Sequence, residues 1–222
     1  MIGYMVQLLA WTAFIAAAIL WPAGRLDYPA GWVLIAMFAL GGGAMILWLA
    51  KHDPKLLRER MAPPVQRGQK PWDRVWLTLF MIGFCIWLPL SSWDAARAGF
   101  TAIPFWLQVL GAAFILAEGA GVWWTFRENS FAAPVVKLQE GQRTIDTGPY
   151  AIVRHPMYAS ALFLFIGVPL LLGSWLGLAL AALFIIAIGW RAVHEEAVLR
   201  AELDDYDAYA ERVRYRLFPG IW

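Results

Sequence analysis

The sequence predicts an all-α integral membrane protein with about six hydrophobic helices, the last two joined as a short-turn hairpin, followed by a cytosolic C-terminal helix. Its 222 residues are 61% hydrophobic and 15% charged, whereas a soluble domain is roughly half apolar and about a quarter charged. The apolar residues also fall into six separate runs. These runs lie at approximately 5–21, 31–50, 75–93, 103–125, 158–173 and 175–190.

The first four runs are close to the about 20 residues that a membrane-spanning helix needs. The last two are shorter and share the tight turn Leu172-Gly173-Ser174-Trp175, which favours a hairpin of tilted or partial spans. No basic segment precedes the first run, so we expect residues 1–20 to be a retained span rather than a cleaved signal. The chain is therefore predicted to be a single membrane domain, 1–222.

The basic residues predict the orientation of the spans. All lysines and arginines except Arg25 and Arg97 lie between spans two and three, between spans four and five, or after span six. Because such residues favour cytoplasmic loops, both termini and both large loops are predicted to be cytosolic, at the inner membrane if the source is a bacterium. A soluble cofactor bound by these loops then comes from the cytosol.

Composition argues against two classes of ligand. The net charge of +2 is small and dispersed, so nucleic acid is not an expected partner. The three histidines and the single Cys85 have no zinc-site spacing, so no metal is expected. Glu118 is an exception to the apolar spans, and a carboxyl in such a run favours a functional or bundle-facing position. The alternative is that it pairs with a polar group of a neighbouring helix.

A polar hinge at 147–158 separates the fourth and fifth apolar runs. Gly148-Pro149 predicts a turn, and Pro156 suits the first position of a new helix. The positive N-terminal end of that helix favours an anion beside Arg154 and His155. Tyr150 and Tyr158 add aromatic faces with hydroxyl groups, suited to an adenine ring or a small cation. The alternative is that these residues are interfacial anchors.

A second informative stretch follows the sixth run. If the helix continues, Arg191, Glu195 and Leu199 share one face, with His194 beside them. They are either a helical ion pair worth only a few tenths of a kcal/mol, or a carboxylate for ribose or amino groups beside a guanidinium for a substrate anion. Residues 204–213 predict an amphipathic surface helix, and 215–222 a tail that returns to the interface in position to cover the site.

These elements together resemble a known family. The motif Gly-x-Tyr-x-x-x-Arg-His-Pro-x-Tyr occupies 148–158, Arg-x-x-x-Glu-Glu-x-x-Leu occupies 191–199, and Tyr-x-x-Tyr-x-x-Arg-Val occupies 206–213. In this order, with the short-turn hairpin between the first two, they resemble the isoprenylcysteine carboxyl methyltransferase family. They are more loosely similar to the phospholipid N-methyltransferases. The resemblance covers 129–222, and the spans in 1–128 add only compatible hydropathy.

The resemblance implies a membrane enzyme that binds S-adenosylmethionine in a cytosol-facing pocket without a Rossmann sheet. Arg191 and Arg154 are then the expected catalytic residues, and Arg191 is an expected contact of the acceptor. Glu118, in the span before the resembling region, is the second expected contact of the acceptor, because a carboxyl in an apolar run favours a functional position. Lys137 lies near a further cofactor position of the family at a different spacing, and Met157 replaces a residue that is usually small. The expected cofactor contacts are Gln142, Arg143, Thr144, Ile145, Tyr150, His155, Pro156, Met157, Tyr158 and Glu195.

Methyl transfer from a sulfonium needs positioning and exclusion of water rather than a protein nucleophile. The predicted function is transfer to a lipophilic acceptor that enters from the bilayer, with a carboxylate as the acceptor group. An amine acceptor would lose a proton, for which Glu118, Glu195 and His194 are candidates. The alternatives are a phospholipid amine N-methyltransferase, an NADPH-dependent membrane reductase of the sterol-reductase type, and a non-enzymatic membrane scaffold.

Overall fold

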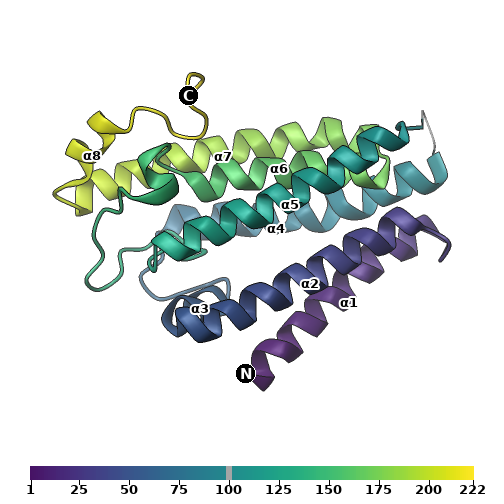
Figure 1. The fold of residues 1–222 in the computed structure, drawn as a ribbon, viewed down its shortest axis with the longest axis horizontal. Helices are drawn as coiled ribbons and strands as arrows, with labels where there is room; N and C mark the ends of the chain where they lie inside the picture. The colour runs from purple at the N-terminus through teal and green to yellow at the C-terminus, as the bar shows by residue number, and fades with distance from the viewer. Residues whose placement is uncertain (99–101) are drawn as a thin grey trace.

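The computed structural model describes residues 1–98 and 102–222, and these residues form helices and connections without a β-strand. The chain is therefore all-α, as the sequence predicts (Figure 1). The elements in order are α1 Ile2–Ala23, α2 Pro29–His52, α3 Pro54–Arg60, α4 Pro71–Trp93, the π-helical turn η1 Asp94–Ala98, α5 Phe105–Glu128, the 3₁₀ turn η2 Gly148–Ala151, α6 Pro156–Leu172, α7 Trp175–Glu202 and α8 Tyr206–Arg212.

Five helices are long and apolar enough to cross a membrane, namely α1, α2, α4 with its π-helical extension, α5 and α7. The sixth apolar helix, α6, has 17 residues, which corresponds to about 25 Å at ~1.5 Å per residue and falls slightly short of a ~30 Å hydrocarbon core. The predicted six hydrophobic helices are confirmed. Of the hairpin pair only α6 is short, because α7 continues without a break to Glu202 and has 28 residues.

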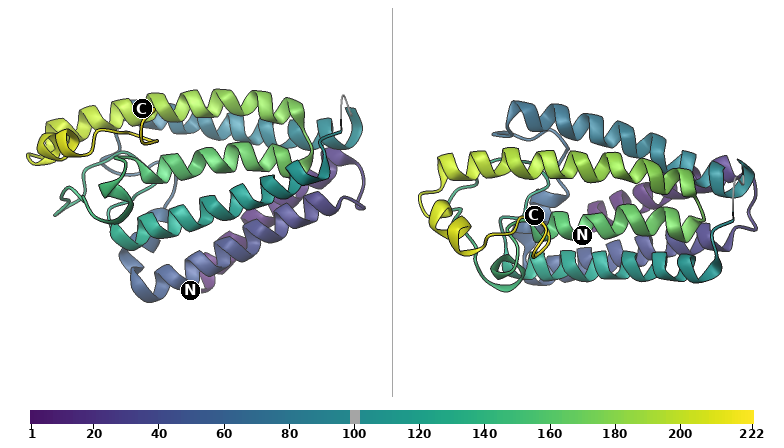
Figure 2. Two further views of the ribbon diagram at one scale, coloured as in Figure 1. Left: turned by 45° about the horizontal axis from the view of Figure 1, so that its top comes forward. Right: turned by 90° about the horizontal axis from the view of Figure 1, so that it is seen from above.

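Helix α6 lies inside the bundle, beside α5 and α7 (Figure 2). Eleven of its residues are buried. It can approach α5 closely because glycines face each other. A Cβ on Gly111 would lie 2.5 Å from the backbone nitrogen of Leu171, and one on Gly167 would lie 2.7 Å from the carbonyl oxygen of Gly111. Small residues at such contacts let membrane helices pack by their backbones.

The hairpin between α6 and α7 turns as the sequence predicts. Gly173 adopts a left-handed conformation with φ of 94°, and the Ser174 side chain accepts a hydrogen bond from the Gly177 amide at 2.8 Å. The Ser174 hydroxyl in turn donates to the buried Asp94 carboxylate at 2.6 Å. At the same end of the bundle, the Tyr28 hydroxyl donates to the Leu172 carbonyl at 2.7 Å. This end is therefore fixed by buried polar contacts.

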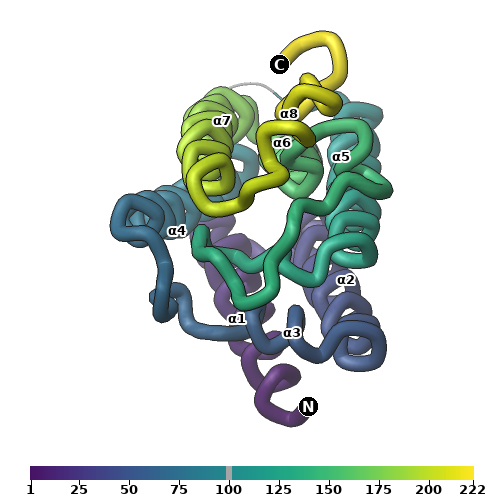
Figure 3. Tube along the Cα trace, turned by 90° about the vertical axis from the view of Figure 1, so that its left-hand side faces the viewer, coloured from purple at the N-terminus to yellow at the C-terminus, as the bar shows by residue number. Residues whose placement is uncertain are grey.

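The opposite end of the bundle carries α3, the segment between α5 and α6, α8 and the chain's N-terminus (Figure 3). Helix α6 begins at Pro156, as predicted. The C-terminal tail runs beside the start of α6, where the amides of Arg154 and His155 donate to the carbonyls of Tyr215 and Arg216, both at 2.9 Å. The segment between α5 and α6 crosses this end, where α7 extends beyond its apolar part.

Candidate functional site

The hinge is held in a compact turn that needs its glycine. Gly148 has a φ of +56°, and a Cβ there would lie 2.4 Å from the Cγ of Glu128. The turn is closed by the Tyr150 amide, which donates to the Thr147 carbonyl at 3.1 Å. The Tyr150 ring is directed inward, where its hydroxyl accepts from the Asn129 side-chain amide at 2.8 Å. Burial raises the pKa of the Tyr150 hydroxyl, so it stays protonated.

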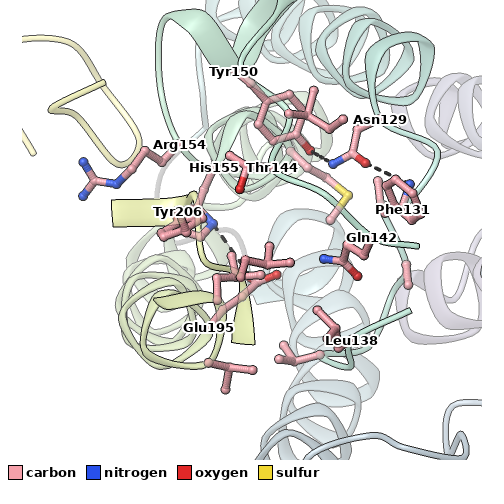
Figure 4. Close-up of a pocket in the computed structure, with 18 of the residues that line it drawn as sticks. Asn129, Phe131, Leu138, Gln142, Thr144, Tyr150, Arg154, His155, Glu195 and Tyr206 are labelled. Atoms are coloured by element: carbon pink, nitrogen blue, oxygen red, sulfur yellow. Dashed lines mark hydrogen bonds and ion pairs between the residues drawn. The ribbon is translucent and has the colours of Figure 1, made fainter. Parts of the chain in front are cut away.

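A cavity opens between this hinge, the segment after α5, the α7 extension and α8 (Figure 4). All ten residues that the sequence proposes as cofactor contacts line it. They are Gln142, Arg143, Thr144, Ile145, Tyr150, His155, Pro156, Met157, Tyr158 and Glu195. Residues far apart in the chain therefore meet at one cavity. The cavity is narrow, with a volume of about 100 Å³, whereas small-molecule sites usually occupy about 300 Å³ or more.

Glu195 provides the carboxylate in the cavity wall. Its Oε2 accepts a hydrogen bond from the Tyr158 hydroxyl at 2.5 Å and lies 3.8 Å from Nδ1 of His155. The His155 ring stacks on the Tyr158 ring at a centroid distance of 5.3 Å and an angle of 8°. The structure therefore brings His155 and Tyr158 of the hinge together with the Glu195 carboxylate from the α7 extension.

Arg154 borders the cavity, but its guanidinium group points away from it (Figure 4). Its Nε donates to Oε1 of Glu196 at 2.7 Å, and Nη1 donates to the carbonyls of Val213 and Arg214 at 2.7 and 2.8 Å. These three acceptors belong to α7 and to the two residues that follow α8. The guanidinium expected at the catalytic position instead ties the hinge to α7 and to the C-terminal segment.

Arg191 does not line the cavity. It lies beneath the cavity, where its Nε donates to Oδ1 of Asp73 at 2.9 Å and Nη2 donates to the Pro134 carbonyl at 2.8 Å. Its guanidinium also lies 4.5 Å from the Trp76 ring centroid and 5.6 Å from that of Tyr158. The pair that forms is therefore Arg191 with Asp73 of α4, not Arg191 with Glu195, because the fully buried Asp73 carboxylate is turned toward it.

Two other candidates lie elsewhere. His194 is outside the cavity, where its ring stacks on Trp190 at a centroid distance of 3.6 Å. Glu118 faces a groove between α2 and α5 within the apolar part of the bundle. Neither side chain reaches the cavity wall. Lys137 does line the cavity, but its ammonium group pairs with Glu59 of α3 at 2.6 Å.

Sequence reasoning missed the contribution of α8. The predicted surface helix is present, but Tyr206 and Tyr209 are 4% and 2% exposed and both line the cavity. The Tyr206 hydroxyl is buried without a hydrogen-bond partner in the described part of the chain. No residue of the tail after α8 lines the cavity, so the expected cover is supplied by these two tyrosines. The sequence feature that could have indicated burial of α8 is the pair of tyrosines, Tyr206 and Tyr209, three positions apart in a polar segment.

Comparison with known proteins agrees with this arrangement. Residues 106–204 match the family model of phospholipid methyltransferases. The matched region is therefore similar to the membrane methyltransferases. The match covers somewhat less than half of the chain, including α5, the hinge and Glu195, and it stops before α8. No curated protein matches the chain.

The match and the resemblance noted in the sequence overlap but have different bounds. The match begins near the start of α5 and ends at residue 204, whereas the resemblance covers 129–222. Inclusion of α5 is physically reasonable, because α5 packs along α6 and thereby positions the start of α6. The match supports the broad class of membrane methyltransferases and leaves the acceptor group open.

The contacts of Arg154 predict a structural effect of its removal. Replacing it with alanine leaves the Glu196 carboxylate, 3% exposed, with Arg216 and His155 as its remaining partners, and breaking a buried pair costs up to about 3–5 kcal/mol. We expect Arg154→Ala to lower the free energy of unfolding by that order, measured by thermal unfolding in detergent. The control is Arg212→Ala, because the Arg212–Asp146 pair is 60% and 51% exposed and contributes at most ~1 kcal/mol. Equal stabilities of the two variants would contradict this assignment.

Proposed function

We propose that this protein transfers a methyl group from S-adenosylmethionine to a lipophilic acceptor held in the membrane, with a carboxylate as the preferred acceptor group. One observation carries the proposal: ten residues proposed from the sequence as cofactor contacts line a single cavity at the end of the helix bundle. The match to phospholipid methyltransferases supports the reaction class.

The lining of the cavity suits this cofactor. Oε1 of Glu195 has no hydrogen-bond partner in the described residues, so it is available to ribose hydroxyls or to an amino group. Tyr150, His155 and Tyr158 offer aromatic faces to an adenine ring or to a sulfonium. The unpartnered Tyr206 hydroxyl is a further group for a polar atom. When bound, the cofactor supplies an electrophilic methyl group.

The chain's own residues bind, orient and exclude water, which is sufficient for an in-line displacement. Bound S-adenosylmethionine would give its methyl group to an acceptor oxygen, with its carbon–sulfur bond broken, and would leave as S-adenosylhomocysteine. A carboxylate acceptor is already a nucleophile, so no general base is needed. The cavity has no serine or cysteine in its lining, and this reaction requires none.

A second candidate is methyl transfer to the amine of a phospholipid, favoured by the description of the matched family. An ammonium group must lose a proton before it attacks. Of the bases considered from the sequence, His194 and Glu118 lie outside the cavity, whereas Glu195 lines it. Glu195 is therefore the general base that this second reaction would use. A nicotinamide-dependent reductase and a scaffold have no comparable support from the family match.

The titration that tests the function uses detergent-purified protein with S-adenosylmethionine, S-adenosylhomocysteine and NADPH. We expect the first two to bind and NADPH not to bind. With a radiolabelled methyl donor and a lipid extract, label should enter the lipid fraction. Release of label by mild base identifies an ester and hence a carboxylate acceptor, whereas base-stable label identifies N-methylation. Binding of NADPH alone would overturn the proposal, as would absence of binding by all three.

Because the cavity has a volume of only about 100 Å³, we expect the segment 138–147 to move outward when a ligand of nucleoside size enters. The inner part of the connection is anchored, since the Val136 amide donates to the buried Asp73 at 2.9 Å. The outer part is held by polar side-chain contacts at the surface, such as Thr144 to Asp205 at 2.6 Å and Arg212 to Asp146 at 2.8 Å. Segments with few buried contacts open locally at low free-energy cost.

We therefore expect S-adenosylhomocysteine to slow amide hydrogen exchange in 138–147 more than elsewhere, because the bound ligand fills the space behind the segment. Hydrogen-exchange mass spectrometry measures this, with the opposite hairpin turn at 172–175 as an internal reference. Exchange that changes equally in both places, or in neither, would speak against cofactor binding in this cavity.

Glu195 is predicted to contribute to cofactor affinity. Glu195→Gln keeps the size of the side chain but removes the charge, and hydrogen bonds to a charged group contribute about 1.5–3 kcal/mol. We expect the affinity for S-adenosylhomocysteine to fall by about tenfold or more, measured by calorimetry, with little change in unfolding temperature. The matched control is Glu202→Gln on the same helix, since Glu202 pairs with Lys70 at the surface. A variant of Glu195 that binds normally would show that its hydrogen bond with Tyr158 is only structural.

A further inference from the structure

Arg60 at the end of α3 differs from Arg154 and Arg191 in having no carboxylate partner. Arg154 pairs with Glu196 and Arg191 with Asp73, whereas none of the ion pairs of the described residues includes Arg60. Its Nη1 donates to the Ala132 carbonyl at 2.9 Å and to the Met157 sulfur at 3.5 Å. Nε and Nη2 have no hydrogen-bond partner in that part of the chain, so they are available to a ligand.

The surroundings of Arg60 favour binding of an anion. The guanidinium lies 4.5 Å from the centroid of the Phe126 ring and the side chain is half-buried. Burial, followed by the charge of Arg191, lowers the pKa of Arg60 to about 10, so the group remains charged near neutral pH. The Glu118 carboxylate partly offsets the charge of Arg60 through space without contacting it. The guanidinium therefore has no counter-ion in direct contact, and an anionic ligand would supply one.

Arg60 also lies between two cavities. Both of its hydrogen-bond acceptors, Ala132 and Met157, belong to residues that line the proposed cofactor cavity. On the other side, Phe126 shares one face of α5 with Val122 and Glu118, and these two residues line the groove between α2 and α5. From Glu118 to Phe126 the helix advances about 12 Å at ~1.5 Å per residue. Arg60 lines neither cavity itself, but its contacts reach the wall of the first and the face of α5 that leads to the second.

The groove has the properties of a site for a hydrocarbon chain. Its volume is about 850 Å³ and it opens between α2 and α5, which lie side by side (Figure 2). Glycines leave room on both walls, and a Cβ on Gly41 or on Gly119 would meet no atom within 4 Å. The remaining wall is apolar apart from Glu118 and includes Met45, Trp48 and Leu164.

We propose that Arg60 binds the anionic group of the membrane acceptor while the acceptor's hydrocarbon chain lies in the groove between α2 and α5. This inference rests on the proposed methyl transfer and names the acceptor class: a lipid with an anionic group close to its chain. The anion is either the carboxylate that receives the methyl group or the phosphate of a phospholipid. Arg60 takes the place that the sequence assigned to Arg191, which is engaged by Asp73.

The test measures binding of two radiolabelled probes, palmitate and dipalmitoyl phosphatidic acid, to the detergent-purified protein. Palmitoyl methyl ester and dipalmitoylglycerol serve as uncharged competitors. The variants are Arg60→Gln and Arg60→Lys, and Arg58→Gln is the matched control because Arg58 is exposed on the same short helix. Affinity for S-adenosylhomocysteine is measured for each variant.

We expect the wild-type protein to bind at least one probe and to prefer it over its uncharged analogue. Arg60→Gln should weaken that binding about 10- to 100-fold, as expected for loss of a charge-assisted hydrogen bond. Arg60→Lys should lose less, because it keeps the charge but not the guanidinium fork. Arg58→Gln should bind like the wild type. Selective binding of palmitate identifies the carboxylate, selective binding of phosphatidic acid the phosphate, and binding of both shows that Arg60 accepts either.

A second variant tests the groove if Arg60→Gln fails to fold. Gly119→Leu places a bulky side chain in the groove, which Arg60 does not line, and it should weaken binding of each probe that the wild type binds. The inference is overturned if the wild type binds neither probe, if the Arg60 and Gly119 variants bind like the wild type, or if Arg58→Gln loses as much as Arg60→Gln. Failure of the wild type to bind S-adenosylhomocysteine would instead overturn the proposed function, and the lipid measurements would still decide the role of Arg60.

Discussion

The buried pair of Asp73 and Arg191 is the interaction on which the cavity depends. Asp73 is fully buried at the start of α4 and accepts from Arg191, from the Gln69 side chain and from the Val136 amide. Arg191 adds a hydrogen bond to the Pro134 carbonyl. The pair thereby joins α4, α7 and the segment after α5. A buried ion pair is costly to form and more costly to break. The geometry of this pair therefore fixes the position of the segment after α5, which lines the cavity.

Two consecutive glutamates of α7 have different partners at the cavity wall. Successive residues of a helix point about 100° apart, so Glu195 faces the cavity while Glu196 faces the hinge and the tail. Glu196 accepts from Arg154 and Arg216 and lies 3.2 Å from His155. These contacts of Glu196 hold the hinge against α7. Glu195 accepts a hydrogen bond only from the Tyr158 hydroxyl and lies near His155, so its other oxygen is available to a ligand.

Local sequence rules predicted the fold well because its signals are local. The length of the apolar runs identified the six hydrophobic helices, and Pro156 and Gly173 located the ends of α6. The candidate cofactor residues also meet as proposed, since the hinge and the α7 extension are each continuous in the chain. The partners of the arginines were not predictable in this way. Asp73 lies 118 positions from Arg191, and no helical spacing relates the two residues.

The same reasoning separates arginines that build the site from one that is available to a ligand. Arg154 and Arg191 each have a buried carboxylate and a backbone carbonyl as partners, so their positive charge is already matched within the fold. Arg60 has a carbonyl, a thioether and an aromatic ring, none of which carries a formal negative charge. The sequence motifs singled out Arg154 and Arg191 and gave no sign of Arg60. The packing of α3 against α5 and the start of α6 leaves the charge of Arg60 without a contacting carboxylate. Its contacts lie near both the polar cavity and the apolar groove, where a lipid with an anionic head group would place its charge.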